Sequence, residues 1–327
     1  MTPTPTPQSP IGSGFGAATT AAEVIKGIDL TGKTVVVTGG YSGIGLETVR
    51  AFRSAGARVV VPTRDMSKAK ARLADMPDVT LETMDLLDPA SIDAFAVRFL
   101  SRSDTLHILV NNAGVMAAPL MRDRRGYESQ FATNHLGHLQ LTCRLWPGLV
   151  RAQGARVITL TSYAHRRAGV DFHDPNFEHR EYNPWIAYGQ SKTANSLFAV
   201  ALDSLGRSRG VRAFAVHPGG IVTDLIRHMS RAEIEASKIL DETGKPIIDP
   251  ENNMKTPQQG AATSVWCATS PQLDHKGGVY CADCEIAPAL PSDDSLEMHG
   301  VRPRAVDPVA AGRLWQLSEQ LTGSALD

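Results

Sequence analysis

The sequence predicts an α/β protein of the doubly wound class, a single domain built on a parallel sheet of seven strands. Short runs of β-branched and aliphatic residues recur along the chain, and they are continuous rather than alternating with polar residues. A parallel sheet covered by helices on both faces needs strands of this kind, and longer amphipathic stretches lie between the runs. The predicted strands cover residues 34–37, 58–61, 79–81, 107–110, 156–160, 211–216 and 278–280.

The length of 327 residues is within the range of one large α/β domain. Residues 1–18 are rich in Pro and Thr, and we expect them to form a disordered tail. The ordered domain is expected over residues 19–327, starting near a capping-box pattern at Thr20. Residues 163–186 and 224–256 fit no strand–helix unit, and the second stretch is predicted to be a lid over the substrate.

The charge balance argues against nucleic acid and anionic membranes as partners. Lys and Arg number 33 against 34 Asp and Glu, which leaves a net charge of −1, so the expected partner is a small molecule. No apolar run approaches the roughly 18 residues that span a bilayer, and the Pro/Thr-rich start does not resemble a secretory signal. The expected location is therefore the cytoplasm, and we allow for a homodimer or a homotetramer.

Neither the cysteines nor the histidines predict a metal centre. The four cysteines are too few and too scattered for a disulfide framework, and the Cys-x-x-Cys pair at 281–284 lacks a second pair of ligands. We expect reduced, structural thiols. His135 and His138 have no obvious third ligand. Structural roles are expected for them and for His165, which is close enough in sequence to Ser162 to border a site there.

A glycine-rich turn follows the first predicted strand and opens a helix. Its glycines, Gly39, Gly43 and Gly45, permit a tight turn and a close approach of the backbone to a ligand. The helix N-terminus offers unpaired N–H groups to a pyrophosphate. A plain strand-to-helix turn with packing glycines is the alternative. The Asn-Asn-Ala-Gly segment at 111–114, after a later strand, favours a dinucleotide cofactor.

The end of the second strand bears on the choice between NADP and NAD. A carboxylate at this place binds a free ribose 2′-hydroxyl, whereas an arginine accommodates the 2′-phosphate. The chain has Thr63 and Arg64 here, and the acid, Asp65, comes one place later. NADP is therefore favoured and NAD is the alternative. The competing interpretation of Arg64 is a surface arginine paired with Asp65.

Tyr188 and Lys192 lie one helical turn apart, which places both side chains on the same face of a helix. Moving a proton at a carbinol oxygen near neutral pH is difficult for a tyrosine with the ordinary pKa of about 10. The charge of Lys192 favours the phenolate, so we predict that Lys192 lowers the pKa of Tyr188 and that Tyr188 is the acid/base. Alone, the pair is also compatible with an ordinary exposed helix face.

Two further polar residues complete the predicted catalytic set. Ser162 stands at the C-terminal end of a predicted strand, the edge where open α/β sheets bind ligands, and its hydroxyl can orient a substrate oxygen. Asn134, on the preceding long helix, could hold a water that relays protons to Lys192. Taken alone, Ser162 could be a turn hydroxyl and Asn134 a residue that bonds to neighbouring backbone. Their occurrence with Tyr188 and Lys192 favours the catalytic interpretation.

These motifs together resemble the short-chain dehydrogenase/reductase family over roughly residues 30–285. The branch that the chain resembles most is that of the retinol dehydrogenases and WW-domain oxidoreductases, through residues 134–138, 161–165 and 283–284 and the long separation of Ser162 from Tyr188. One departure is that Tyr41 and Ser42 replace the basic residue of some NADP-preferring members.

The resemblance implies a Rossmann-type fold and a contact role for several further residues. Asp85 and Leu86 would border the adenine, and Val222 and Thr223 would contact the nicotinamide carboxamide. Lys192 would also bind the nicotinamide ribose. The full set of expected cofactor contacts is Gly39, Tyr41, Ser42, Gly43, Ile44, Gly45, Thr63, Arg64, Asp85, Leu86, Asn112, Ala113, Gly114, Tyr188, Lys192, Pro218, Gly219, Val222 and Thr223.

The function expected from the sequence is hydride transfer between a nicotinamide cofactor and an alcohol, ketone or aldehyde. Aromatic residues in 163–186 and aliphatic residues in the lid predict a bulky hydrophobic substrate; the aliphatic lid residues include Leu225, Ile226, Met229, Ile234 and Ile239. A sugar-nucleotide epimerase would space its glycines differently. A non-catalytic NADP-binding sensor or scaffold is the alternative from another class, although such proteins typically lose one of the catalytic residues.

Overall fold

The computed structural model describes residues 5–326, which form a sheet of eight strands in the order β3-β2-β1-β4-β5-β6-β7-β8. The first seven are parallel to their neighbours, as the sequence predicts for a doubly wound fold, and β8 is antiparallel to β7. The strands are β1 (Thr34–Val37), β2 (Arg58–Thr63), β3 (Thr80–Thr83), β4 (Ile108–Asn111), β5 (Ala155–Leu160), β6 (Val211–His217), β7 (Val279–Ala282) and β8 (Glu285–Ile286).

The predicted count of seven strands is one short, because the sequence contains no recognisable signal for β8. This strand has only two residues and follows β7 through a two-residue turn at Asp283 and Cys284. Both turn residues have positive φ, 55° and 57°, a conformation that tight hairpins usually assign to Asn, Asp or Gly, and Cys284 is none of these. Neither the length nor the turn residues of this hairpin could be recognised from the sequence.

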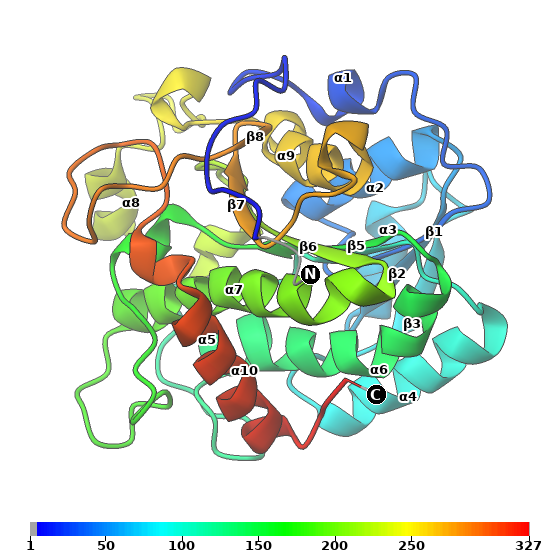
Figure 1. Cartoon of the computed structure of the whole chain (residues 1–327). Helices are drawn as coiled ribbons and strands as arrows, with labels where there is room; N and C mark the ends of the chain where they lie inside the picture. Colours follow the sequence, from blue (N-terminus) through cyan, green and yellow to red (C-terminus); the bar gives the residue numbers. More distant parts are fainter. Residues whose placement is uncertain (1–4, 327) are drawn as a thin grey trace.

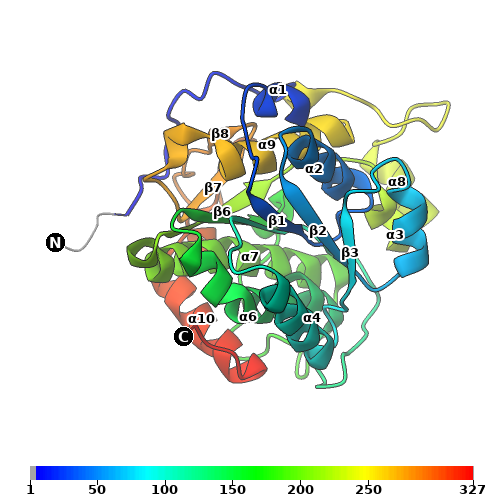
Figure 2. The same ribbon diagram turned by 90° about the vertical axis from the view of Figure 1, so that its right-hand side faces the viewer.

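Helices cover both faces of the sheet (Figures 1 and 2). One layer contains α1, α2 and α9, and the other contains α4, α6, α7 and α10. The helices are α1 (Ala21–Ile25), α2 (Gly43–Ser54), α3 (Met66–Arg72), α4 (Pro89–Arg102), α5 (Ser129–Phe131), α6 (Gly137–Arg151), α7 (Pro184–Gly206), α8 (Arg231–Ser237), α9 (Pro257–Thr269) and α10 (Pro308–Thr322).

Successive residues of the central strands belong to two different hydrophobic cores. In β1, Val36 joins the core formed with α4, α6, α7 and α10, whereas Val35 and Val37 join the core with α1, α2 and α9. All three valines are fully buried. Side chains alternate across a strand, so a sheet buried on both faces needs apolar residues at every position. This is the physical origin of the continuous runs in the sequence.

The segment before α1 is attached to the sheet edge, so the expectation of a disordered tail over 1–18 does not hold for residues 8–13. The Gln8 side chain donates to the carbonyls of Tyr280 and Ala287 and accepts from the Tyr280 N–H. The Glu285 carboxylate accepts from the N–H groups of Ile11, Gly12 and Ser13. Single long-range hydrogen bonds of this kind leave no trace in composition. Residues 1–4 lie outside the described part of the chain.

Four histidines are buried in the described part of the chain, and each is at most 3% exposed: His135, His138, His165 and His217. Burial lowers the pKa of His135 and His217 to about 3 and that of His138 and His165 to about 4. All four rings are therefore neutral at physiological pH. Within residues 5–326, no helix is long and apolar enough to cross a membrane.

The buried histidines should make the protein sensitive to mild acid. Below the ordinary histidine pKa of about 6.5, these four side chains bind protons in the unfolded chain but not in the folded chain. The free energy of unfolding should therefore fall as the pH drops from about 7 to about 5, and unfolding near pH 5 should take up about four protons. Urea unfolding at a series of pH values measures this slope. Replacing the exposed His275 with Gln should leave the profile unchanged. A free energy of unfolding that does not change between about pH 7 and about pH 5 would contradict the conclusion that the four buried histidines are neutral in the folded protein.

Candidate active site

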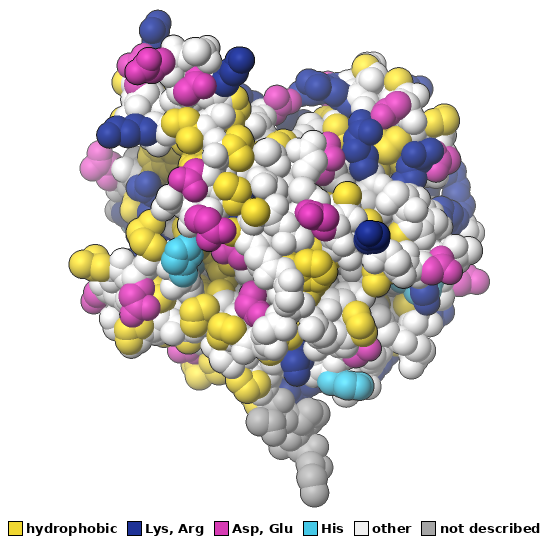
Figure 3. Space-filling model, turned by 90° about the horizontal axis from the view of Figure 1, so that it is seen from above, with side chains coloured by type: hydrophobic (Ala, Val, Ile, Leu, Met, Phe, Trp, Pro, Cys, Tyr) yellow, Lys and Arg dark blue, Asp and Glu magenta, His cyan; other side chains and the backbone are white. Residues whose placement is uncertain are grey.

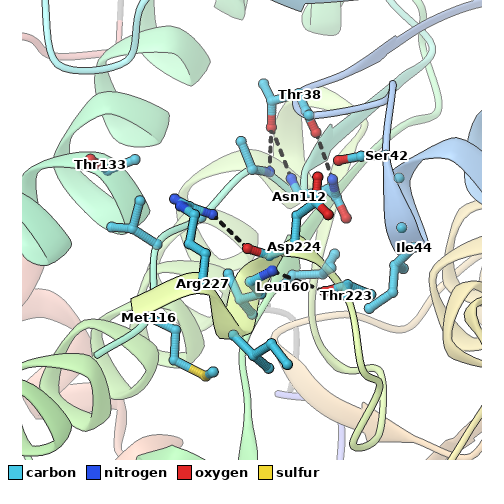
Figure 4. Close-up of a pocket in the computed structure, with 18 of the residues that line it drawn as sticks. Thr38, Ser42, Ile44, Asn112, Met116, Thr133, Leu160, Thr223, Asp224 and Arg227 are labelled. Carbon is cyan, nitrogen blue, oxygen red and sulfur yellow. Dashed lines mark hydrogen bonds between the residues drawn. The ribbon is translucent and has the colours of Figure 1, made fainter. Parts of the chain in front are cut away.

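A cavity of about 960 Å³ lies at the carboxyl edge of the parallel strands, where the strand order changes direction between β1 and β4. Figure 4 shows part of its lining. All but one of the predicted catalytic and cofactor-contact residues line this cavity: Gly39, Tyr41, Ser42, Gly43, Ile44, Gly45, Thr63, Arg64, Asp85, Leu86, Asn112, Ala113, Gly114, Ser162, Tyr188, Lys192, Pro218, Gly219, Val222 and Thr223. The exception is Asn134.

The turn between β1 and α2 has the geometry of a phosphate cradle. Gly39 and Gly43 have φ values of 65° and 52°, in the left-handed region that favours glycine. A Cβ atom on Gly45 would lie 2.4 Å from the Gly39 carbonyl oxygen and 2.5 Å from Asn112 Nδ2, so only glycine fits there. The Ser42 side chain makes no capping bond to α2, which leaves the first N–H groups of this helix available to an anion. The residues present therefore fit a dinucleotide pyrophosphate.

A hydrogen-bonded chain from His138 fixes the segment that borders this cradle. His138 Nδ1 lies 3.0 Å from the Asn134 carbonyl, which can only accept, so the neutral ring presents Nε2 as an acceptor to the Thr38 hydroxyl 2.9 Å away. With its proton directed to His138, Thr38 Oγ1 accepts from the N–H groups of Asn112 and Ala113, at 2.9 and 3.0 Å. The expectation of a structural role for His138 is met, and the role is to position this wall of the cavity.

At the far end of the cradle, the acid beside Arg64 is already engaged. Asp65 is the N-cap of α3, and its carboxylate accepts from the Lys68 N–H at 2.9 Å. Arg64 is exposed and makes no ion pair with any residue that the structure describes. The competing interpretation, an Arg64–Asp65 surface pair, is therefore not met. The Arg64 guanidinium is left available to a ligand at this end of the cavity.

Ser162, Tyr188 and Lys192 meet at the opposite end. Ser162 follows β5, and its hydroxyl accepts from the Ala164 N–H at 3.2 Å and is close enough to Tyr188, on α7, to favour the phenolate of that residue. Lys192 follows one turn later, with Nζ 5.6 Å from the centre of the Tyr188 ring and 2.9 Å from the Leu160 carbonyl to which it donates. Both side chains are at most 5% exposed. The spacing of the pair on one helix face is as the sequence predicts.

Burial dominates the electrostatics of this pair and corrects one expectation. It raises the pKa of Tyr188 to about 12, against a lowering contribution from the Ser162 hydrogen bond. It lowers the pKa of Lys192 to about 8. The prediction that Lys192 lowers the pKa of Tyr188 is therefore not met in this structure, because removing the phenolate from water raises that pKa and the opposing influence comes from Ser162 rather than Lys192. Tyr188 is a protonated donor at neutral pH.

Asn134 lies behind the cavity rather than in it. It belongs to a π-helical turn, Ala132–Leu136, that precedes α6. Its amide bonds to both backbone groups of Val115 at 2.9 Å and donates to Ser191 Oγ at 2.9 Å. A Cβ atom on Gly114 would lie 3.2 Å from Asn134 Oδ1 and 3.8 Å from Lys192 Nζ, so the missing side chain leaves space between the two.

The other histidines and the cysteines occupy structural positions. His135 contacts Ser318 of α10 at 2.7 Å. His165 bonds to the Ser162 carbonyl at 2.8 Å, but it packs behind Ser162 and does not line the cavity. The four cysteines are buried, and none of them forms a disulfide within the described residues.

Several lining residues were not recognised as site residues from the sequence. Met116, Met121 and Met254 line the apolar part of the cavity, and no motif marks them. Lys68 lies four positions after Arg64, but α3 begins only at Met66, so no helical spacing in the sequence indicated it. Of the aliphatic lid residues, Leu225, Ile226, Met229 and Ile239 line the cavity as expected, whereas Ile234 does not.

Comparison with known proteins agrees with this geometry. The family model described as short chain dehydrogenase matches residues 33–234. The "Probable oxidoreductase" of Streptomyces lividans is 43% identical over 88% of this chain and 97% of its own length, and human retinol dehydrogenase 12 is 37% identical over 90% and 88%. The crystal structure of a protein from Mycobacterium paratuberculosis, described as uncharacterised, has a TM-score of 0.71 at 32% identity and covers 95% of this chain and 99% of that one. The chain belongs to the short-chain dehydrogenase/reductase family and is an NAD(P)-dependent oxidoreductase that acts on CH–OH groups.

Proposed function

We propose that the protein transfers a hydride between NADP and a bulky hydrophobic alcohol or the corresponding ketone or aldehyde. The observation that carries this proposal is one continuous cavity with two different ends. One end combines the glycine turn with the available guanidinium of Arg64. The other places Ser162 and Tyr188 against a wall of apolar side chains. A cytoplasmic location and a homodimer or homotetramer remain part of the proposal, to be tested by cell fractionation and light scattering.

The substrate end favours a large apolar molecule. Its lining includes Val115, Met116, Met121, Trp185, Leu225, Ile226, Met229, Ile239 and Met254. Methionine side chains adapt to ligands of irregular shape. The hydroxyl groups of Ser162 and Tyr188 are the polar groups placed to meet a substrate oxygen, so the reacting carbon would be held beside them and the rest of the molecule against the apolar wall.

In the proposed mechanism, Ser162 donates a hydrogen bond to the substrate oxygen and holds it beside Tyr188. A nicotinamide cofactor, when bound, supplies or takes up the hydride. Tyr188 is protonated at neutral pH and gives its proton to the oxygen during carbonyl reduction, and in the reverse direction its phenolate accepts the hydroxyl proton. Lys192 would hold the ribose hydroxyls of the cofactor, and its charge would favour the phenolate as this forms. A water in the space beside Gly114 would connect Lys192 to Asn134 as a proton relay.

Substituting Tyr188 with Phe tests this assignment. Turnover should fall by at least about 10²–10⁴-fold, because the proton donor is lost, while cofactor affinity stays near the wild-type value. Cofactor oxidation with a panel of bulky ketones and aldehydes, together with fluorescence titration, measures both quantities. Tyr163→Phe is the control, since Tyr163 stacks on His217 and does not line the cavity. Wild-type turnover in folded Tyr188→Phe protein would refute the catalytic role and favour a sensor or scaffold.

The preference for NADP over NAD is assigned to Arg64. Replacing it with Ala should weaken NADPH binding by about 10- to 100-fold and leave NADH binding within about twofold, since a hydrogen bond to a charged group contributes about 1.5–3 kcal/mol. Dissociation constants for both cofactors provide the measurement. Arg50→Ala removes an arginine of α2 that pairs with Asp75 away from the cavity, and it should change neither. Equal losses for both cofactors, or a wild-type preference for NADH, would refute the assignment.

Residues 224–256 are proposed to act as a lid over the substrate end. Two backbone hydrogen bonds close the base of this segment, from the Gly220 N–H to Asn253 and from the Lys255 N–H to the Gly220 carbonyl, at 2.7 and 2.9 Å. Farther out, Trp185 Nε1 donates to Glu233 of α8 at 2.8 Å. Closure would exclude water from the hydride path.

Hydrogen exchange tests the lid. Protection of residues 224–256 should rise when NADPH and a productive hydrophobic ligand are added, because the apolar half then packs on the ligand. The buried face of α10 serves as an internal reference that should not change. Full protection of the segment before any ligand is added would rule out a mobile lid.

A further inference from the structure

One ion pair connects the cofactor end of the cavity to the first residue of the lid. Lys68 Nζ, on α3, lies 3.0 Å from Asp224 Oδ2. Asp224 opens the short helix Asp224–His228 directly after Thr223, and both partners line the cavity. Figure 4 shows Asp224 beside Thr223, with the Arg227 guanidinium donating to the main-chain carbonyl of Asp224. The pair therefore joins two segments that are 156 residues apart in sequence.

Asp224 is the carboxylate that pairs with the Lys68 ammonium. The neighbouring acid Asp65 caps α3 through the Lys68 backbone N–H, so its carboxylate is engaged elsewhere. The hydrogen bond from Lys68 holds the pKa of Asp224 below its ordinary value. The positive charges of Lys68, Arg72 and Arg227 lower this pKa further. Asp224 is thus ionised at neutral pH. At 44% and 52% exposure the two side chains form a pair of the weak, exchangeable kind.

Lys68 also shares its rim of the cavity with Arg64. The two lie four positions apart, at the start of α3 and just before it, and both line the cavity beside Thr63. A dianionic phosphate held by the Arg64 guanidinium would attract the nearby ammonium and repel the Asp224 carboxylate. An ammonium on a flexible stem can exchange one anionic partner for another at little cost.

We propose that Lys68 is a second ligand of the cofactor 2′-phosphate and that Asp224 is the carboxylate which this phosphate displaces. The inference rests on the proposed use of NADP. Lys68 and Asp224 then determine cofactor preference in opposite directions. Lys68 adds affinity for a 2′-phosphate, and Asp224 reduces that affinity by competing for the same ammonium.

The test is whether removing the charge of each partner of the ion pair changes the affinity for NADPH in the opposite direction. Lys68→Gln should weaken NADPH binding by about tenfold, while Asp224→Asn should strengthen it by about two- to fivefold, and neither should change NADH binding by more than about twofold. Titration of the full-length protein by cofactor fluorescence gives these affinities. Calorimetry with adenosine 2′,5′-bisphosphate and adenosine 5′-monophosphate isolates the 2′-phosphate without any turnover.

Two control variants make the same changes in charge away from the cavity. Lys70→Gln removes another exposed lysine of α3, and Glu242→Gln removes an exposed acid of the lid. Neither should alter the ratio of NADPH to NADH affinity. A change as large in Lys70→Gln as in Lys68→Gln would show a general effect of charge and overturn the inference.

The remaining outcomes separate this inference from the proposed function. If the wild-type protein binds the bisphosphate no better than the monophosphate, the use of NADP and the inference both fail. If it prefers the bisphosphate but Lys68→Gln keeps that preference, only the role of Lys68 is overturned. If Asp224→Asn weakens NADPH and NADH equally, Asp224 is a structural tether and its competition with the phosphate is overturned.

Discussion

Burial of both faces of the parallel sheet is the constraint on which the rest of this structure depends. It forces apolar residues at successive positions of the central strands, as Val35, Val36 and Val37 show, and it requires a helical layer on each side. Neither face is then open to a ligand. The carboxyl edge of the strands is the surface that remains, and the cavity lies along it, with polar residues supplied by the strand ends and by the segments that follow them.

The cofactor end of this edge is built by close backbone approach. The turn lies against Asn112 and Ala113. The conformations of Gly39 and Gly43 and the absence of a side chain on Gly45 allow this close approach. Hydrogen bonds then hold that approach: the Asn112 amide donates to the Thr38 carbonyl at 2.8 Å, and the Thr38 hydroxyl is oriented by His138. A neutral, buried histidine thus contributes to the site without contacting a ligand.

At the catalytic end, desolvation decides how the groups behave. Tyr188 and Lys192 are both buried, and burial disfavours the charged form of each, so it moves their pKa values in opposite directions. A protonated phenol suits the proposed carbonyl reduction, in which Tyr188 would donate its proton. In the proposed mechanism, alcohol oxidation would need the phenolate of Tyr188. The favoured direction would then depend on how strongly the bound complex stabilises that phenolate against the cost of burial.

The parallel sheet, the glycine cradle and the pairing of Tyr188 with Lys192 could all be predicted from the sequence alone, because each rests on local spacing or on continuous hydrophobic runs. The sequence could not determine what depends on contacts distant along the chain. The attachment of Gln8 to β7, the short strand β8, and the removal of Asn134 from the cavity wall all belong to this group. The pKa of Tyr188 and the meeting of Lys68 with Asp224 do as well. Burial and long-range hydrogen bonding are properties of the packed molecule, so these features arise only when the chain has folded.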